Sequence, residues 1–441
     1  MQPDVRRERW LVLASGVAVM ITVGAAFSWS LYTRPLMALF GWSSFGVALV
    51  FSFLTFFFGV GAIVGGRLHD HVGPRRTVLF GALIWGGASA LAGLGLGHFD
   101  LWWLDVVYGA LGGTGCGMLY VVPGATAAKW FPEERGLANG IILCGFGFGS
   151  LGFNLVAGAF GTFNRLANTA TATIAARNAA TAAGQTFAVP GHVARADVAV
   201  VAALFFWSGV AYAVIGILSA LVLRLPPEGF SVPKAAAKLA REYDFTPGEM
   251  VRTRAFYLVW LIVLVNATCG LALFSAAVPI YAQTSGLSGA AATVAFGWAS
   301  AANGIGRLLW AWLSDIIGRT PSLAICLVLE GLGLFWIAHA HGVLPAAAAF
   351  VTVLLCFGGI FAIAPAVMAD FFGTRFFGED YSLIITAAAL AGIVGPLFAA
   401  GLEDAFGSLT AWLTPISAAL LLAAIIPFFT REPVASGAVA A

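Results

Sequence analysis

The sequence has few charged side chains for its length. Of 441 residues, 10% are charged and 60% are hydrophobic, whereas a soluble globular domain has about 25% charged residues. Too few polar side chains remain to cover a water-soluble surface, which argues against a soluble enzyme and against a disordered chain. The formal net charge is only +2. The sequence therefore also lacks the basic excess that is typical of a protein that binds nucleic acid.

Cysteines and clusters of metal-ligating residues are scarce as well. There are five cysteines and no Cys-x-x-Cys pair, which argues against a disulfide framework and a zinc site. A membrane-embedded enzyme would need a cluster of histidines or carboxylates inside its hydrophobic runs, and we find none. We therefore expect no enzymatic activity, no cofactor and no bound metal.

What the sequence has instead is a series of long hydrophobic runs. A helix that spans a bilayer needs roughly 20 apolar residues, and about 12 runs reach that length. Their approximate ranges are 10–35, 45–68, 76–97, 101–128, 136–160, 198–224, 254–282, 289–313, 320–341, 344–369, 380–401 and 408–430. The runs are continuous instead of alternating, which favours helices over a β-barrel. The sequence thus predicts an all-α polytopic membrane protein with twelve transmembrane helices in two six-helix bundles.

Two polar segments interrupt this series. The segment 225–253 separates six runs from six. It predicts an N-terminal bundle at 1–224, a cytoplasmic linker at 225–253 and a C-terminal bundle at 254–441. The segment 161–197 is rich in Ala, Thr and Asn and is not apolar enough to span. We expect it to be a surface excursion on the outer side.

The loop charges predict the orientation of the chain in the membrane. Of the 22 Lys and Arg residues, 17 fall in loops on one side and three in loops on the other, while Arg34 and Arg307 lie inside runs. Basic residues gather in cytoplasmic loops. We therefore expect a multi-pass protein of the plasma (inner) membrane with both termini in the cytoplasm.

A short motif occurs twice, once in each half. Each copy has an Asp, a Gly three residues later and then an Arg, and Asp315 follows Asp70 by 245 residues. Repeats on this scale are typical of transporters built from two related bundles. An Asp at a helix end can accept hydrogen bonds from a neighbouring helix N-terminus or from Arg, and Gly permits a tight turn. We predict that both copies gate the cytoplasmic side, with an ordinary charged loop as the alternative. The predicted gating residues are Gly66, Asp70, Gly73, Arg75, Asp315, Gly318 and Arg319.

The first copy, Gly-x-x-x-Asp-x-x-Gly-x-Arg, resembles the signature of the major facilitator superfamily. Within that family the chain is similar to the oxalate/formate antiporter and monocarboxylate transporter group. This similarity rests on Phe27–Tyr32, Tyr120, Lys129–Gly136, Phe245–Thr253 and Asn303-x-x-x-Arg307. The second copy departs from the signature, because Ala311 stands where the leading Gly is expected. The resemblance implies twelve helices around a central cavity that opens alternately to each side.

Arg307 is the most unusual residue of the hydrophobic runs. Asp315 marks the end of its run, eight residues away, which corresponds to about 12 Å along a helix and places Arg307 near the middle of a core roughly 30 Å thick. An Arg at that depth costs about 2.5–3.5 kcal/mol and keeps its charge. A bound carboxylate offsets this cost through a bidentate pair. Asn303 lies on the same helix face and can bind Arg307 or the substrate. The alternative is a structural Arg paired within the protein.

The residues that the resemblance places around the cavity favour a small monoanion. The antiporters of this group hold a dianion with a second cation, a Lys, and the matching position here is Ala388. Phe27, Phe357, Phe361 and Ile385 stand where the oxalate carrier has more polar or larger aromatic side chains, although helix packing is the alternative role of each Phe. Tyr120 can donate a hydrogen bond from the other half. The predicted substrate-binding residues are Arg307, Asn303, Tyr120, Phe27, Phe357 and Phe361.

The predicted function is secondary active transport of small monocarboxylates such as lactate or pyruvate, coupled to a proton, by alternating access. In the related monocarboxylate carriers an acid four residues before the Arg often takes part in proton transfer. This chain has Asn303 at that position, which cannot titrate. Symport and antiport are therefore both open. One alternative is an organic-anion antiporter of the oxalate/formate type. The other is a non-transporting membrane sensor, which should carry a signalling domain, whereas only about ten residues follow the last run.

Overall fold

The computed structural model describes most of the chain. The described residues are 3–131, 135–159, 162–163, 165–166, 168–170, 173, 176, 195–227, 244–373, 376–408 and 410–433. Most of the predicted surface excursion, 161–197, and the central part of the predicted linker, 228–243, lie outside them. Within the described residues the regular structure is helical, apart from one isolated bridge between Leu96 and Phe99.

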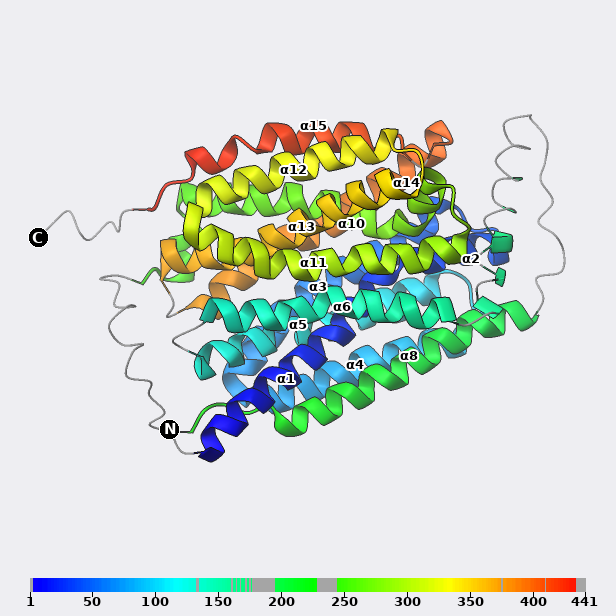
Figure 1. The fold of residues 1–441 in the computed structure, drawn as a ribbon. Coiled ribbons are helices and arrows are strands. Elements are labelled where there is room, and N and C mark those ends of the chain that lie inside the picture. Colours follow the sequence, from blue (N-terminus) through cyan, green and yellow to red (C-terminus); the bar gives the residue numbers. More distant parts are fainter. Residues whose placement is uncertain are drawn as a thin grey trace, which may run out of the picture.

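The N-terminal half forms six spans from nine helical segments (Figure 1). They are α1 (Pro3–Ala25), the short helix η1 (Ala26–Ser28), α2 (Ser30–Phe40), α3 (Ser44–Val72), α4 (Pro74–Gly95), the π-helix η2 (Leu104–Gly112), α5 (Gly113–Trp130), α6 (Arg135–Ala159) and α8 (Arg195–Val222). The C-terminal half follows the same plan. It contains α10 (Arg254–Ser285), α11 (Gly289–Ile317), α12 (Arg319–His339), α13 (Val343–Phe372), α14 (Phe377–Phe406), α15 (Leu413–Ala423) and η3 (Ile426–Phe429). The short helix α9 (Pro247–Met250) lies before it, within the predicted linker.

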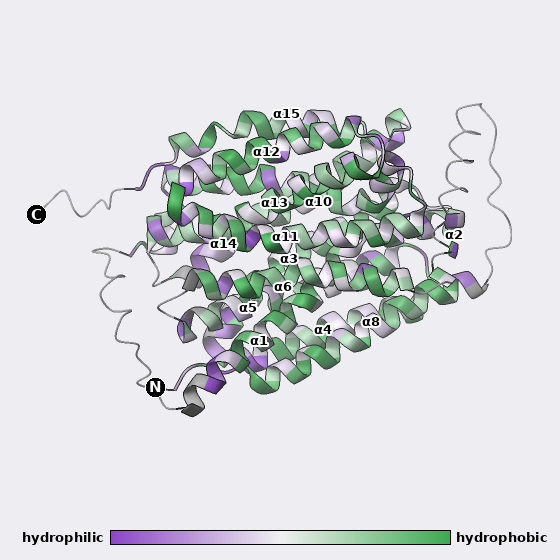
Figure 2. Ribbon diagram, in the orientation of Figure 1, coloured by the Kyte–Doolittle hydropathy of each residue, from purple (hydrophilic) through white to green (hydrophobic). Residues whose placement is uncertain are grey.

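These helices have the length and composition of membrane spans. Among the described residues, ten helices are long and apolar enough to cross a bilayer, and α15 with η3 forms a shorter apolar helix. The remaining span is α11, which is 29 residues long but carries Asn303, Arg307 and Asp315. Hydrophobic residues dominate along the helices, while hydrophilic ones gather toward the two ends of the bundle (Figure 2). Large side chains such as Trp207 and Leu422 are exposed, as expected of a surface that faces lipid. The predicted all-α fold is confirmed.

The first predicted span, 10–35, is not one continuous helix. α1 ends at Ala25, η1 forms a single tight turn, and α2 continues from Ser30 to Phe40. At Gly24 a β-carbon would lie 1.8 Å from the carbonyl oxygen of Phe146, so glycine lets α1 approach the backbone of α6. Hydrophobicity could not reveal this break, because the residues on both sides of it are apolar. The break lies at Phe27, which is one of the predicted substrate-binding residues.

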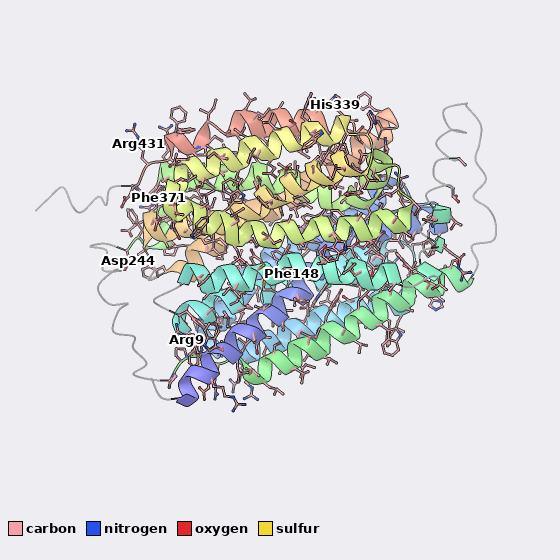
Figure 3. All side chains as sticks on the ribbon, in the orientation of Figure 1. Arg9, Phe148, Asp244, His339, Phe371 and Arg431 are labelled. Carbon is pink, nitrogen blue, oxygen red and sulfur yellow. The ribbon has the colours of Figure 1, made fainter. Side chains whose placement is uncertain are left out.

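Two pairs of helices form most of the contact between the halves. α6 meets α11 where Gly147 approaches the backbone of Gly304. α3 runs antiparallel to α14, with Gly59 against Ala389 and Thr55 against Gly392. Arg9, Asp244 and Arg431 lie at one end of the bundle (Figure 3), the end at which α3 and α11 finish and α14 begins.

Candidate functional site

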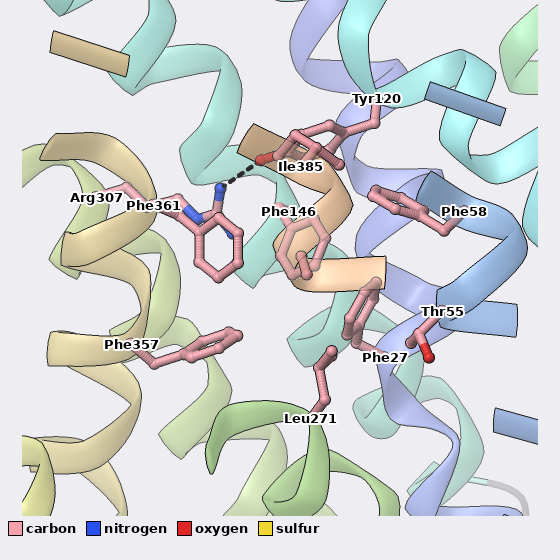
Figure 4. A pocket seen from close by; sticks show the side chains of 11 residues that line it. Phe27, Thr55, Phe58, Tyr120, Phe146, Leu271, Arg307, Phe357, Phe361 and Ile385 are labelled. Atoms are coloured by element: carbon pink, nitrogen blue, oxygen red, sulfur yellow. Dashed lines mark hydrogen bonds between the residues drawn. The ribbon is translucent and has the colours of Figure 1, made fainter. Parts of the chain in front are cut away.

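A small cavity lies between the two halves, midway along the bundle. Its volume is about 30 Å³, which is room for about two water molecules. The N-terminal half supplies Phe27, Thr55, Phe58, Tyr120 and Phe146, and the C-terminal half supplies Leu271, Arg307, Phe357, Phe361, Ile385 and Ala388 (Figure 4). All but Ala388 are classed as buried. The cavity is therefore closed toward both ends of the protein.

Arg307 is the one charged residue in this lining, and it is held by neutral groups. Its side chain comes from α11, and the residue is 2% exposed. Its Nη1 donates a hydrogen bond of 3.4 Å to the hydroxyl oxygen of Tyr120. The guanidinium carbon lies 4.6 Å from the ring centre of Phe146 and 5.7 Å from that of Phe361. Cation–π contacts of this kind stabilise a buried cation without neutralising it.

No described acid compensates this charge. Arg307 forms no ion pair with any described residue, and its Nε has no hydrogen-bond partner among them. A buried charge left without a counter-ion is costly, and Arg keeps its proton in any realistic environment. The cavity thus presents guanidinium donors that suit the planar, bidentate geometry of a carboxylate.

Glycines explain how Arg307 reaches this position. A β-carbon on Gly147 would lie 2.3 Å from the backbone nitrogen of Gly304, so α6 and α11 can cross this closely only with glycine there. Phe146 immediately precedes one glycine, and Arg307 follows the other by three residues. The close crossing therefore brings the Phe146 ring and the guanidinium together although they belong to different halves.

Aromatic rings form most of the remaining wall. The Phe27 and Phe146 ring centres are 4.6 Å apart, those of Phe58 and Tyr120 are 5.1 Å apart, and those of Phe357 and Phe361 are 5.2 Å apart. The Thr55 hydroxyl donates to the carbonyl oxygen of Phe51 on its own helix, at 2.9 Å. The cavity therefore offers one cation, one phenol and an apolar enclosure.

Five of the six predicted binding residues line this cavity, and Asn303 does not. A β-carbon on Gly358 would lie 2.4 Å from the Asn303 Oδ1, so Asn303 packs against α13. Its Oδ1 is buried and has no hydrogen-bond partner among the described residues. Asn303 thus contacts α13, whereas Arg307, one helical turn further along α11, lines the cavity.

Sequence reasoning did not single out Thr55, Phe58, Phe146 or Leu271, which also line the cavity. No sequence signal distinguishes them, because a Phe or Leu in an apolar run is far more often a packing residue. Ile385 and Ala388, which the resemblance places around the cavity, both lie in its wall.

The two motif copies have matching backbone geometry. Gly73 ends α3 and precedes α4 with φ 84°, and Gly318 ends α11 and precedes α12 with φ 95°. Both values lie in the region that favours glycine, so each glycine permits the turn between two antiparallel helices. Gly66 lies within α3, and Arg75 is exposed in the first turn of α4. The side chain of Asp70 lies outside the described part of the structure.

The described contacts of the second copy stay within the C-terminal half. Arg319 forms ion pairs with Asp315, at 2.6 Å, and with Asp370 of α13, at 3.0 Å. Its Nη1 also donates to the Ser314 hydroxyl. Arg319 therefore ties together the ends of α11, α12 and α13.

Twelve spans in two halves around a central cavity define a polytopic carrier of the membrane. The chain belongs to the Major Facilitator Superfamily, whose family model matches residues 13–302 and 269–441. This confirms the resemblance seen in the sequence and makes the protein a multi-pass membrane transporter, of a family whose members are generally not enzymes.

Characterised relatives include carriers of organic anions. The chain is 28% identical to the oxalate:formate antiporter of Oxalobacter formigenes, over 95% of this chain and 91% of the relative. It is 30% identical to apicoplast pyruvate carrier 1 of Toxoplasma gondii, over 74% of this chain and 64% of that protein.

Solved structures of transporters share the fold. The fucose:proton symporter of E. coli superposes with a TM-score of 0.61 at 16% identity, covering 96% of this chain and 98% of the symporter. An inward-facing bacterial homologue of the human lysosomal transporter Spinster superposes with a TM-score of 0.62 at 16% identity, covering 98% and 96% of the two chains.

Proposed function

We propose that this transporter carries small monocarboxylates, such as lactate or pyruvate, by alternating access. The observation that supports this most is Arg307, a permanent cation in a closed central cavity with no described acid beside it. A substrate carboxylate would supply the missing charge through a bidentate pair. The aromatic rings would enclose its apolar part, and Tyr120 would donate from the opposite half.

The charge count of the cavity supports a monoanion. Arg307 is the one ionised side chain in the lining, and the C-terminal wall has Ala388 where a second cation would favour a dianion. A dianion would bury one charge without compensation, at high cost. The pyruvate carrier of Toxoplasma gondii, a relative by sequence, agrees with this substrate class.

Proton coupling is part of the proposal, and Asp380 is its best candidate residue. Asp380 is 1% exposed in the first turn of α14, and neither carboxyl oxygen has a hydrogen-bond partner among the described residues. The charged groups that act on it, Glu379 and Asp244, are both acidic. A carboxylate in this place would be costly to bury, whereas the protonated acid costs less. Exchange of one anion for another without a proton is the alternative, which the oxalate:formate antiporter among the relatives favours.

We also propose that both termini face the cytoplasm of a plasma (inner) membrane. The loop charges support this orientation, and Arg9, Asp244 and Arg431 lie at the same end of the bundle (Figure 3). In this orientation the motif residues Gly66, Asp70, Gly73, Arg75, Asp315, Gly318 and Arg319 are proposed to gate the cytoplasmic side.

The test is uptake of labelled mono- and dicarboxylates into proteoliposomes, with and without an imposed pH gradient. We expect lactate or pyruvate to be taken up and the gradient to drive their accumulation. Oxalate transport equal to or better than theirs would overturn the substrate assignment. Exchange that ignores the gradient would replace symport with antiport.

A matched pair of variants tests Asp380. Asp380→Asn should lose accumulation driven by the gradient yet still exchange internal for external substrate, because exchange needs no net proton movement. Asp100→Asn removes an exposed carboxyl that has no part in the proposed coupling and should behave like the unmodified protein. If Asp380→Asn accumulates substrate normally, the coupling proton binds elsewhere.

A further inference from the structure

The two halves are tied together by polar contacts at the end of the bundle where α3 begins. The Ser44 hydroxyl of α3 donates to Glu403 Oε2 of α14 at 2.6 Å. The backbone N–H of Phe45 donates to Asp404 Oδ2 at 3.3 Å. Arg34 Nη2 of α2 lies 3.8 Å from Glu403 Oε1. These contacts join the N-terminal half to α14, and they lie at the opposite end from the duplicated motif.

The two acids are poorly placed for their own helix. Glu403 and Asp404 lie in the last turn of α14, which ends at Phe406. The C-terminal end of a helix carries partial negative charge and disfavours carboxylates. The first turn of α3 carries partial positive charge and has backbone N–H groups with no partner inside the helix. The N-terminal end of α3 therefore stabilises the two carboxylates, whereas the C-terminal end of α14 destabilises them.

The first turn of α3 divides its donors between the two halves. Ser43 caps its own helix by accepting the N–H of Gly46 at 3.0 Å. The N–H of Phe45 is left for Asp404 in the other half. The side chains of Arg34 and Glu403 are each only 14% exposed, so water and salt screen their pairing less than they screen a surface pair.

These contacts close over a second cavity between the halves. Ala48 of α3 and Ala399 of α14 line it from opposite sides, together with Ser44 and Glu403. Thr33 and Ser275 also line it, and the Thr33 hydroxyl donates to the carbonyl oxygen of Ser275 on α10, at 3.1 Å. The polar contacts thus cover a space that a substrate from this side would have to cross.

We propose that Glu403 and Asp404 form an outer latch, in which α14 holds Arg34 and the first turn of α3 while the protein is closed to the outside. The latch must release before a substrate can enter from that side. The inference rests on the proposed transport by alternating access and on the proposed orientation. It adds an outer counterpart to the predicted cytoplasmic gate. Helices α3 and α14 then each have an acid of a gate in their last turn, Asp70 in α3 and Glu403 in α14.

The test is accessibility of the covered cavity, measured without any substrate. Ala399→Cys places a thiol in its wall, and the five native cysteines are all buried. We would treat intact cells with a membrane-impermeant thiol reagent from outside. Adding Glu403→Gln and Asp404→Asn should raise the rate of labelling roughly tenfold, the order expected for losing hydrogen bonds to charged groups. Glu379→Gln, an exposed acid at the other end of α14, should leave the rate unchanged.

A second measurement keeps the proposal falsifiable if the double variant folds poorly. Ser44→Cys with Glu403→Cys, bridged by a bifunctional thiol reagent, should stop transport until the link is cleaved. An unchanged labelling rate in the folded double variant, or undiminished transport by the bridged protein, would overturn the outer latch. The labelling result does not depend on which substrate is carried, so it fails or succeeds separately from the monocarboxylate assignment.

Discussion

The two halves of the protein contribute differently to the central cavity. The C-terminal half supplies the cation, Arg307, whereas the N-terminal half supplies rings and hydroxyl groups, among them Phe146 and Tyr120. The N-terminal half has no charged side chain in the lining, so it cannot neutralise a carboxylate alone. Arg307 reaches across to Phe146 and Tyr120, so a substrate bound between them would bring the halves together. Binding and closure are therefore expected to be one process.

The largest effect should follow loss of the C-terminal cation. Arg307→Gln removes the charge, and Arg307→Lys keeps it but loses the planar fork that binds a carboxylate bidentately. We expect both to weaken substrate binding roughly 100-fold or more, as for truncation of a buried charge pair. Substrate binding to purified protein is the measurement. Arg431→Gln, at an exposed position, is the control. Near-normal binding by Arg307→Gln would remove the basis of the proposed function.

A second cation in the same wall should change substrate class. Ala388→Lys would give the C-terminal half two positive charges and should let oxalate compete with lactate or pyruvate, with competition for uptake as the measurement. Ala388→Leu adds bulk without charge and should not favour oxalate. An identical response to the two variants would mean that cavity size, and not charge, sets the selectivity.

Removing the polar contribution of the N-terminal half should have a moderate effect. Tyr120→Phe deletes the hydroxyl that accepts from Arg307 while keeping the ring against Phe58. A hydrogen bond of this kind contributes about 1 kcal/mol, so we expect binding to weaken roughly fivefold. Titration of the purified variant with substrate measures this. No change would indicate that the hydroxyl only supports Arg307 in the empty protein.

The cation that defines the site could be predicted from sequence, but the groups around it could not. Arg307 is conspicuous because charge is expensive in an apolar span. Phe146 and Phe58 are not, because rings of the same type fill many other positions of the same helices. The break at Phe27 and the packing of Asn303 against Gly358 depend on how closely particular helices approach each other. Hydrophobic patterns report which segments span the membrane and leave those approaches undetermined.

The smallest effects should come from single rings. Phe146 is closer to the guanidinium than Phe361, at 4.6 Å and 5.7 Å. Cation–π contacts are worth about 0.5–2 kcal/mol depending on desolvation. We therefore expect Phe146→Leu to weaken binding more than Phe361→Leu does, by roughly fivefold against twofold. If the same titration shows that Phe361→Leu weakens binding more than Phe146→Leu does, the C-terminal ring contributes more to holding Arg307 than the N-terminal ring.

The most direct test of the central claim compares a carboxylate with its neutral amide. Purified protein should be titrated with lactate and pyruvate and with lactamide and pyruvamide, which have similar shape but no charge. If Arg307 pairs with the substrate carboxylate, at least one acid should bind roughly 100-fold more tightly than its amide, and Arg307→Gln should abolish the difference. Equal binding of acids and amides, or a preference that survives in Arg307→Gln, would contradict the account.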